Sequence, residues 1–313
     1  MKYPLYLSFV FLALLSSCED PVDLGIPLVD PKLVIISNFS DLDTLEVVIS
    51  KSQNAFEDGP TEYVSNAKVD IFQGNTYLET LKFVDINDAI FPSYYVSDFL
   101  VPEIGKTYTI EVSAPGFETV KAVNTIPGPA TLDSTTLNLE LDIVQQDLTF
   151  NQVNFTVSLK LKDPPGIENY YHLSFYQEGF DYKIDINGDT IREAFFSLPL
   201  AVEELGGDVP LVPYIDRRGV LLKDSDMTGS TLELLTFEGN FLFRRNDQLL
   251  GDFIIELRTV SEEYYLYHTS LARQYQSSLD PFSDPVILFN NIENGCGIFA
   301  GFISRFYLLD SGQ

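Results

Sequence analysis

Apolar and polar residues alternate in short runs along most of this chain. The clearest run is 155–161, in which Phe155, Val157, Leu159 and Leu161 are separated by polar residues. A period of two residues places the apolar side chains on one face of a β-strand, where they can be buried together. Comparable runs, separated by turn residues, lie at 33–36, 45–49, 67–71, 77–83, 90–96, 108–112, 120–125, 137–144, 171–175, 182–186, 231–237, 241–245 and 253–259. The pattern predicts a mainly β protein.

The first seven runs fall within residues 32–126 and are divided by turn sequences such as Gln73-Gly74-Asn75 and Pro115-Gly116. Seven short strands in about ninety residues are typical of an immunoglobulin-like or transthyretin-like β-sandwich. We therefore expect an Ig-like β-sandwich over this range. The chain has no tryptophan, and neither of its two cysteines lies in this range, which excludes an antibody-type domain.

Pro127-Gly128-Pro129 interrupts the chain after the seventh run. The prolines remove backbone donors and the glycine relaxes the backbone, so we place a domain boundary here. The remainder, 130–313, is predicted to be a second β-rich domain. Within it, Asn187-Gly188 predicts a hairpin with a type I′ turn. The stretch 197–229 carries several prolines and glycines and is expected to be a long irregular loop.

One amphipathic helix is predicted late in the chain, near 261–278. Ser261 can cap its first turn, and Glu262 and Glu263 suit the positive end of the helix dipole. Asp280-Pro281 is expected to end it. One face carries Tyr264, Tyr267, His268, Leu271 and Tyr275 at helical spacing. We expect this aromatic stripe to pack on a sheet rather than to bind a ligand.

The net charge of the chain excludes some classes of binding partner. Asp and Glu number 46 against 19 Lys and Arg, a formal net charge of −27. Such a chain repels nucleic acid and anionic head groups, so we exclude binding to DNA, RNA or peripheral lipid. The ordinary interpretation is a solvated surface, and binding of calcium or a cationic ligand is the alternative.

The first residues have the features of a secretory signal. Lys2 precedes an apolar run at 5–15, which is shorter than the roughly 20 residues that a membrane-spanning helix needs. The run ends in Leu15-Ser16-Ser17-Cys18, which resembles a bacterial lipobox. Acyl chains on the cysteine would anchor the protein stably to a membrane. We predict a lipoprotein signal peptide at 1–17, lipidation at Cys18 and an acidic tether at 18–31.

Glu19 and Asp20 follow Cys18 directly. Acidic residues at this place resemble the signal that exports lipoproteins of Bacteroidota to the outer face of the outer membrane. We therefore expect a lipid-anchored outer-membrane protein that is exposed at the cell surface. The residues themselves leave open which face of the membrane it occupies.

Few residues suit catalysis. His172 lies opposite the apolar set of its predicted strand and is expected to be exposed, whereas His268 belongs to the helix stripe and is expected in the core. Cys296 has apolar neighbours and is expected to be buried and inert. The motifs of zinc hydrolases, serine hydrolases, P-loops and Cys-x-x-Cys proteins are absent. We predict no catalytic residue, cofactor or metal, and interpret the acidic clusters 181–189 and 224–229 as turns.

Two polar stretches are candidates for contact with a protein partner. They are 53–62 and 198–226, and the second carries Tyr214, Arg217 and Arg218. Tyrosine and arginine are favoured at the centres of protein interfaces, which makes these three the candidate partner-contact residues. The alternative is that both stretches are ordinary solvated loops.

Several motifs in a fixed order resemble one known family. They are the lipobox, Val64 to Ile71, Gly105 to Tyr108, 222–229, the aromatic helix and Asn291 to Gly301. In this order they resemble the domain-of-unknown-function 4249 (DUF4249) lipoproteins of Bacteroidota, with Cys296 where leucine is expected. The resemblance implies that the protein accompanies a TonB-dependent outer-membrane transporter. It assigns no activity and no catalytic residues.

Three hypotheses follow. The first is a non-enzymatic lipoprotein that serves as an accessory or substrate-capture subunit beside a TonB-dependent β-barrel transporter. The second is a cell-surface glycan hydrolase, which requires two carboxylates about 5 to 10 Å apart beside a sugar site. The third is a structural or adhesive surface module. The bound substrate and the stoichiometry are not specified by the residues.

Overall fold

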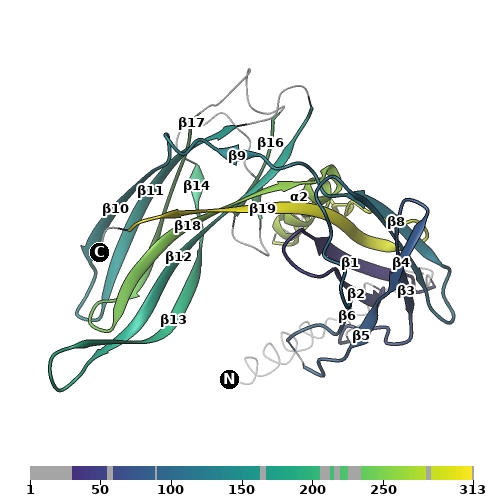
Figure 1. The fold of residues 1–313 in the computed structure, drawn as a ribbon, viewed down its shortest axis with the longest axis horizontal. Coiled ribbons are helices and arrows are strands. Elements are labelled where there is room, and N and C mark those ends of the chain that lie inside the picture. Colours follow the sequence, from purple (N-terminus) through teal and green to yellow (C-terminus); the bar gives the residue numbers. More distant parts are fainter. Residues whose placement is uncertain are drawn as a thin grey trace, which may run out of the picture.

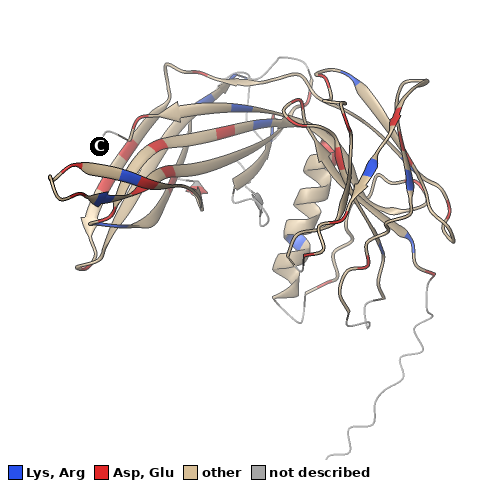
Figure 2. Ribbon diagram, turned by 60° about the horizontal axis from the view of Figure 1, so that its bottom comes forward, with Lys and Arg blue, Asp and Glu red and all other residues tan. Residues whose placement is uncertain are grey.

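The computed structural model describes residues 30–54, 59–88, 90–162, 167–204, 212–214, 219–224, 234–279 and 283–311. Within these ranges the chain forms three β-sheets and one helix, arranged as an arch with a β-sandwich at each end (Figure 1). The mainly β fold with one late helix is therefore confirmed. Acidic residues are spread over both ends of the arch (Figure 2).

A ten-stranded sheet runs through the whole arch. Its strand order is β15 (Val212–Tyr214), β16 (Gly219–Lys223), β12 (Tyr170–Ile184), β18 (Gln248–Val260), β19 (Cys296–Leu309), β1 (Leu33–Phe39), β2 (Glu46–Lys51), β6 (Tyr94–Val96) and β5 (Lys82–Val84), and β13 (Thr190–Leu200) also pairs with β12. This sheet supplies one layer to each of the two sandwiches.

A smaller sheet supplies the second layer at each end. The N-terminal one has the order β4 (Thr76–Thr80), β3 (Lys68–Gln73), β7 (Thr107–Ser113) and β8 (Val120–Thr125). The other has the order β10 (Asn138–Gln145), β11 (Phe150–Lys162), β17 (Leu234–Arg244) and β14 (Glu203–Glu204), with β9 (Thr131–Leu132) paired to β11. The period-two patterns explain both layers, because the apolar residues of each strand point between the sheets.

Each sandwich has its own apolar core. Ile35 and Ile49 of the long sheet meet Val69 and Ile110 of the four-stranded sheet in the N-terminal core. In the second core, Phe155 of β11 packs against Phe253 of β18 with 5.2 Å between the ring centroids. The alternating residues Phe155, Val157, Leu159 and Leu161 are all buried.

Strand β19 links the two sandwiches. Its first half pairs in parallel with β1, from Val34 opposite Cys296 to Phe39 opposite Gly301. Its second half pairs antiparallel with β18, from Val260 opposite Phe302 to Phe253 opposite Leu309. The N-terminal sandwich thus includes a strand from the end of the chain, and the division at 127–129 stays a prediction.

Helix α2 (Glu262–Ser278) covers the middle of the long sheet on the face opposite the two cores. Ser261 caps it, since its side chain accepts a hydrogen bond from the Tyr264 backbone N–H. Tyr264, Tyr267 and His268 are buried against the sheet, as predicted, beside Ile298, Ala300 and Phe302 of β19. Tyr275, also in the predicted stripe, is instead exposed, because the last turns project beyond the sheet (Figure 2).

No helix in the described part of the chain is long and apolar enough to cross a membrane. The membrane association expected from the lipobox concerns residues 1–29, which lie outside the described ranges. The predicted signal peptide, most of the acidic tether and Cys18 are therefore not tested by the fold.

The hairpin at Asn187-Gly188 is confirmed, but its predicted turn type is wrong. Strands β12 and β13 pair from Ile184 opposite Thr190, so the loop has five residues, Asp185 to Asp189, instead of two. Only Gly188 of this loop has a positive φ, at 88°. The Asp185 carboxylate accepts the backbone N–H groups of Asn187 and Asp189, which favours the longer turn.

The expectation of an irregular loop at 197–229 is wrong in part. Strand β13 continues to Leu200, and β16 lies inside the long sheet, paired with β12. Val220, Leu221 and Leu222 are buried because β16 is covered on both faces, by the second core and by α2. Residues 205–211, 215–218 and 225–233 lie outside the described ranges.

We expect Gly297→Ala to destabilise the protein strongly. Gly297 has a φ of 112°, and an added Cβ would lie 2.0 Å from the Ile35 carbonyl oxygen of the paired strand. The left-handed backbone conformation and the overlap of the added methyl group with the neighbouring strand should together lower the free energy of unfolding by about 3 kcal/mol. The control is Gly188→Ala, which has a φ of 88° but no atom within 4 Å of the added Cβ, and should lose only about 1 kcal/mol. Equal losses in urea unfolding would contradict this.

Candidate functional site

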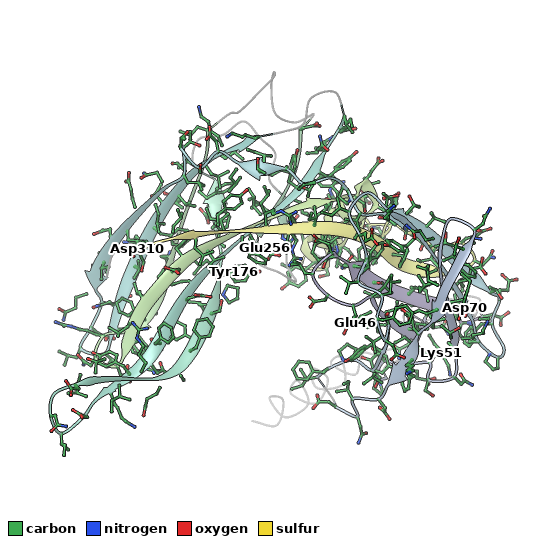
Figure 3. All side chains as sticks on the ribbon, in the orientation of Figure 1. Glu46, Lys51, Asp70, Tyr176, Glu256 and Asp310 are labelled. Atoms are coloured by element: carbon green, nitrogen blue, oxygen red, sulfur yellow. The ribbon has the colours of Figure 1, made fainter. Side chains whose placement is uncertain are left out.

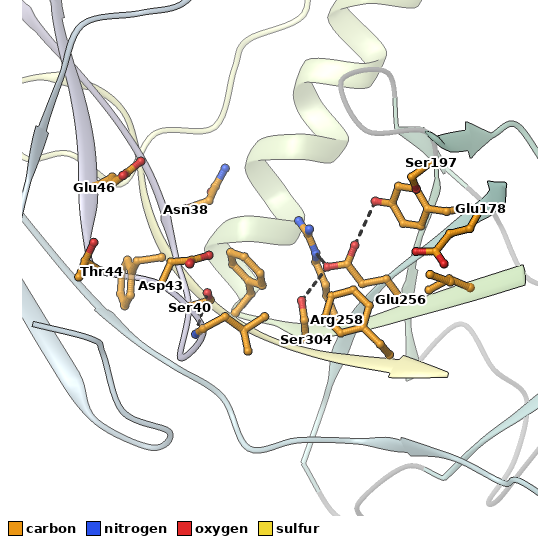
Figure 4. A pocket seen from close by; sticks show the side chains of 16 residues that line it. Asn38, Ser40, Asp43, Thr44, Glu46, Glu178, Ser197, Glu256, Arg258 and Ser304 are labelled. Carbon is orange, nitrogen blue, oxygen red and sulfur yellow. Dashed lines mark hydrogen bonds and ion pairs between the residues drawn. The ribbon is translucent and has the colours of Figure 1, made fainter. Parts of the chain in front are cut away.

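A cleft of about 660 Å³ lies on the concave side of the arch (Figure 4). Residues 38–46, from the end of β1 to the start of β2, form one wall, and β12, β13, β18 and β19 form the floor and the other wall. The lining residues are Asn38, Phe39, Ser40, Leu42, Asp43, Thr44, Glu46, Tyr176, Glu178, Ser197, Ile254, Glu256, Arg258, Phe302, Ser304 and Phe306. Figure 3 shows Glu46 across the concave side from Tyr176 and Glu256.

Strand alternation explains why the cleft is polar. In β18, Ile255 and Leu257 point into the second core, so Glu256 and Arg258 point to the opposite face of the sheet. Helix α2 covers only the middle of that face. The uncovered part, between the helix and the β1–β2 loop, forms the cleft.

A buried ion pair forms the floor. Arg258 Nε lies 2.5 Å from Glu256 Oε1, and the side chains are only 5% and 4% exposed. Tyr176 donates its hydroxyl to Glu256 Oε2 at 3.1 Å, and Ser304 donates to Glu256 Oε1 at 2.7 Å. Both carboxylate oxygens are therefore satisfied, which a buried charge requires.

These contacts keep both groups of the pair charged. Burial by itself raises the pKa of Glu256. Arg258, followed by Ser304 and Tyr176, lowers this pKa by more than burial raises it, so the pKa lies below its ordinary value. Burial lowers the pKa of Arg258, but Tyr264 and Glu256 raise it above its ordinary value. The guanidinium also lies 4.6 Å from the centroid of the Phe302 ring, a cation–π contact.

Carboxylates line the rim of the cleft. Asp43, Glu46 and Glu178 form no ion pair with any residue that the structure describes. Burial and the like charge of Asp43 raise the pKa of Glu46. Phe306 is 51% exposed and offers an apolar surface beside them. In the described ranges, no three His, Cys, Asp or Glu side chains are grouped as metal ligands.

The expectation that His172 is exposed is wrong. It does point away from the second core, but α2 covers that face, and His172 is completely buried. Its Nδ1 lies 3.1 Å from the Tyr264 hydroxyl and its Nε2 lies 3.3 Å from Ser174 Oγ. His268 lies in the core, as predicted, with its ring centroid 4.2 Å from that of Tyr264. Both histidines support the packing of α2.

Cys296 is half-buried, whereas full burial was expected. It shares the α2 face of β19 with Ile298, Ala300 and Phe302, which are in contact with the helix cluster. Cys296 comes two residues earlier, at the first position of the strand, and its side chain is only partly covered.

None of the three predicted contact residues is among the described residues that line the cleft. Tyr214 is in β15, where its backbone pairs with Gly219, and its side chain is not described. Arg217 and Arg218 lie outside the described ranges. The sequence pattern missed Glu256 and Arg258, although charged residues at alternate positions of a strand must share one face.

Comparisons with known proteins identify a family for this chain but assign no activity to it. The model of the family "Domain of unknown function (DUF4249)" matches residues 19–304. No curated protein matches the chain significantly.

Two solved structures show distant likeness. A chaperone–tip adhesin complex of fimbriae is 11% identical, covering 74% of this chain and 85% of that chain with a TM-score of 0.23. The B domain of a biofilm associated protein is 6% identical, covering 88% of this chain and 85% of that chain with a TM-score of 0.16. TM-scores this low carry no argument about fold or function.

We expect Arg258→Met to destabilise the protein by about 3 to 5 kcal/mol, because it leaves Glu256 buried without its cation. Urea unfolding at neutral pH measures this. Arg244→Met is the control, since Arg244 pairs with Asp181 and Asp247 on the surface with 39% of its side chain exposed. The control should lose far less stability. Equal losses of stability in the two variants would show that the buried pair stabilises the protein no more than the exposed pairs of Arg244 do.

The loss in Arg258→Met should shrink as the pH falls. In the native protein the pKa of Glu256 is lowered, so its stabilising effect is present above the unfolded pKa and is lost as the pH falls through the folded pKa. In the variant, burial without the cation raises this pKa, so acid relieves the buried charge. The difference in unfolding free energy between the two proteins should therefore be smaller at about pH 4 than at about pH 7. A constant difference would contradict this.

Proposed function

The chain belongs to the DUF4249 family, and we propose that it is a lipid-anchored outer-membrane protein that captures a ligand for a TonB-dependent transporter. In this proposal the protein is non-enzymatic and acts as an accessory subunit of the β-barrel. The cleft on the concave side of the arch is the capture site. The cleft is the single observation that carries the proposal.

The cleft has the properties that a capture site needs. Its volume of about 660 Å³ lies in the range of small-molecule sites, roughly 300 to 1,000 Å³. Its floor is a hydrogen-bonded ion pair, which holds Glu256 and Arg258 in one geometry. Polar groups from the β1–β2 loop, β12 and β18 and the exposed ring of Phe306 can orient a ligand. A surface module with a purely structural or adhesive role would not need such a cleft.

The N-terminal sequence supports the location. A lipid on Cys18 would hold the body at the membrane through the tether 18–31, and β1 begins directly afterwards at Leu33. The acidic residues after Cys18 agree with exposure at the cell surface. The order of the family motifs supports the transporter as the partner.

A glycan hydrolase is the second candidate. The observation that favours it is Glu46, whose pKa is raised by burial and by Asp43, as a general acid requires. Asp43, whose charge acts on Glu46, would be the second carboxylate, because Glu256 is held by Arg258. Release of reducing sugar from a glycan panel, lost in Glu46→Gln, would establish this candidate in place of ours.

The proposal predicts two results from the native bacterium. Mass spectrometry of the mature N-terminus should find Cys18 acylated, and Cys18→Ala should leave the protein unprocessed and without lipid. The lipidated protein, purified through a C-terminal tag in mild detergent, should bring a TonB-dependent barrel with it. An unacylated N-terminus cleaved elsewhere would refute the anchor. Purification without any barrel would refute the partner.

A further inference from the structure

We propose that β10 is a docking edge for an extended segment of another protein, in which lysine or arginine alternates with aliphatic residues. The segment would pair with the edge of β10 that faces away from β11, and so add a strand to the smaller sheet of the second sandwich. Strand addition of this kind is a general mode of peptide recognition. The inference goes beyond the proposed function, because none of the described residues that line the cleft belongs to β10.

The backbone of β10 is paired on one side. The strand comes last in its sheet, next to β11, and lies at the outer margin of the arch (Figure 1). Its register with β11 runs without a bulge from Asn138 opposite Ser158 to Gln145 opposite Asn151. No backbone–backbone hydrogen bond joins 138–145 to a described residue outside β11. About half of the N–H and C=O groups of the strand therefore point away from the sheet, in a row that a further strand can bind.

The side chains of β10 that face the core are incompletely covered. Leu139, Leu141 and Ile143 alternate along this face and lie opposite three buried residues of β11. Leu139 and Leu141 are only partly buried, and Ile143 is 36% exposed. Burial thus decreases sharply at the last strand of the sheet. Aliphatic side chains on an added strand would cover these three residues, and burial of apolar surface would stabilise the complex.

The side chains on the outer face of β10 favour a basic partner. Glu140 and Asp142 are exposed on that face and form no ion pair with any residue that the structure describes. Opposite charges on neighbouring strands stabilise their pairing, whereas like charges destabilise it. Two copies of β10 paired side by side would bring their carboxylates together, which disfavours a second copy of this chain. A strand with lysine or arginine beside Glu140 and Asp142 is favoured instead.

β10 also lacks most of the features that keep edge strands from pairing. Protected edge strands are short or carry lysine, proline or a bulge. β10 has eight residues, and its sequence, Asn-Leu-Glu-Leu-Asp-Ile-Val-Gln, includes no lysine, proline or glycine. By contrast, the edge strands β5, β14 and β15 have two or three residues, and β13 carries Pro199. The acidic residues of β10 are left to decide which strands can pair with it.

Three peptides of equal length, with both ends capped, test the proposal. The probe is Lys-Val-Lys-Ile-Lys-Val-Lys. One control, Lys-Lys-Val-Ile-Val-Lys-Lys, has the same composition without the alternation, and the other, Lys-Val-Lys-Pro-Lys-Val-Lys, lacks a backbone donor at its centre. Fluorescence anisotropy with the full mature protein should show that the probe binds at least about tenfold more tightly than either control, because only the probe forms the whole hydrogen-bond ladder. Equal binding of a control would overturn the proposal.

Matched variants locate the binding. Ile143→Lys directs a charge toward the core side of the edge, which blocks strand pairing, and should weaken probe binding at least about tenfold. Its control, Val123→Lys, adds the same charge at an exposed position of β8 and should leave binding unchanged. Glu140→Gln should weaken binding by about two- to fivefold, whereas Glu118→Gln, exposed between β7 and β8, should not. Urea unfolding should show that all four variants are folded.

Hydrogen exchange identifies the strand that binds. The backbone amides of 138–145 should exchange more slowly in the presence of the probe, because the added strand accepts their hydrogen bonds. Unchanged exchange in this range, or probe binding that Ile143→Lys and Glu140→Gln leave unaltered, would overturn the proposal.

Sedimentation of the protein without peptide tests the other occupant. A dimer that Ile143→Lys dissociates would assign the edge to a second copy of this chain and overturn the basic partner, whereas a monomer agrees with the proposal. These results do not depend on co-purification of the barrel, so the docking edge and the proposed function can fail separately.

Discussion

The fold depends on β19 being hydrogen-bonded to β1 in its first half and to β18 in its second half. Residues near the two ends of the chain become neighbours in one sheet as a result. The N-terminal core is incomplete without Phe299 and Ile303, and the second core adjoins Tyr307 and Leu309 of the same strand. Since each half of β19 serves a different sandwich, backbone hydrogen bonds hold the two ends of the arch in a fixed relation.

The cleft is a consequence of how this long sheet is covered. One face carries the two cores along its length, so its residues must be apolar. The other face is covered by α2 only in the middle, where Ile298, Ala300 and Phe302 are apolar. Beyond the helix the same strands present Glu256, Tyr176 and Ser304, which form the floor of the cleft and satisfy one another's hydrogen bonds. The boundary between covered and uncovered sheet is where Arg258 stacks on Phe302.

The sequence predicted what depends on local pattern and missed what depends on distant partners. The period-two runs located most strands, and Ser261 and the aromatic stripe located α2, because both signals are contained in neighbouring residues. His172 was misplaced, because only the helix ninety residues later buries its face. Strand β16 was missed, because Val220 to Leu222 is a short apolar run within a stretch of prolines and glycines. The cleft could not be predicted, since its walls come from residues 38–46 and from strands far along the chain.

The parallel pairing of β1 with β19 also has a mechanical consequence. The chain enters β1 at Leu33 and runs in the same direction as β19, so a pull on the N-terminus acts along the axis of β1. Such a force shears the whole ladder between β1 and its neighbours at once, instead of unzipping one hydrogen bond after another. A body held by its N-terminal end in flowing liquid would thus bear the load on the hydrogen bonds that join β1 to β19 and β2.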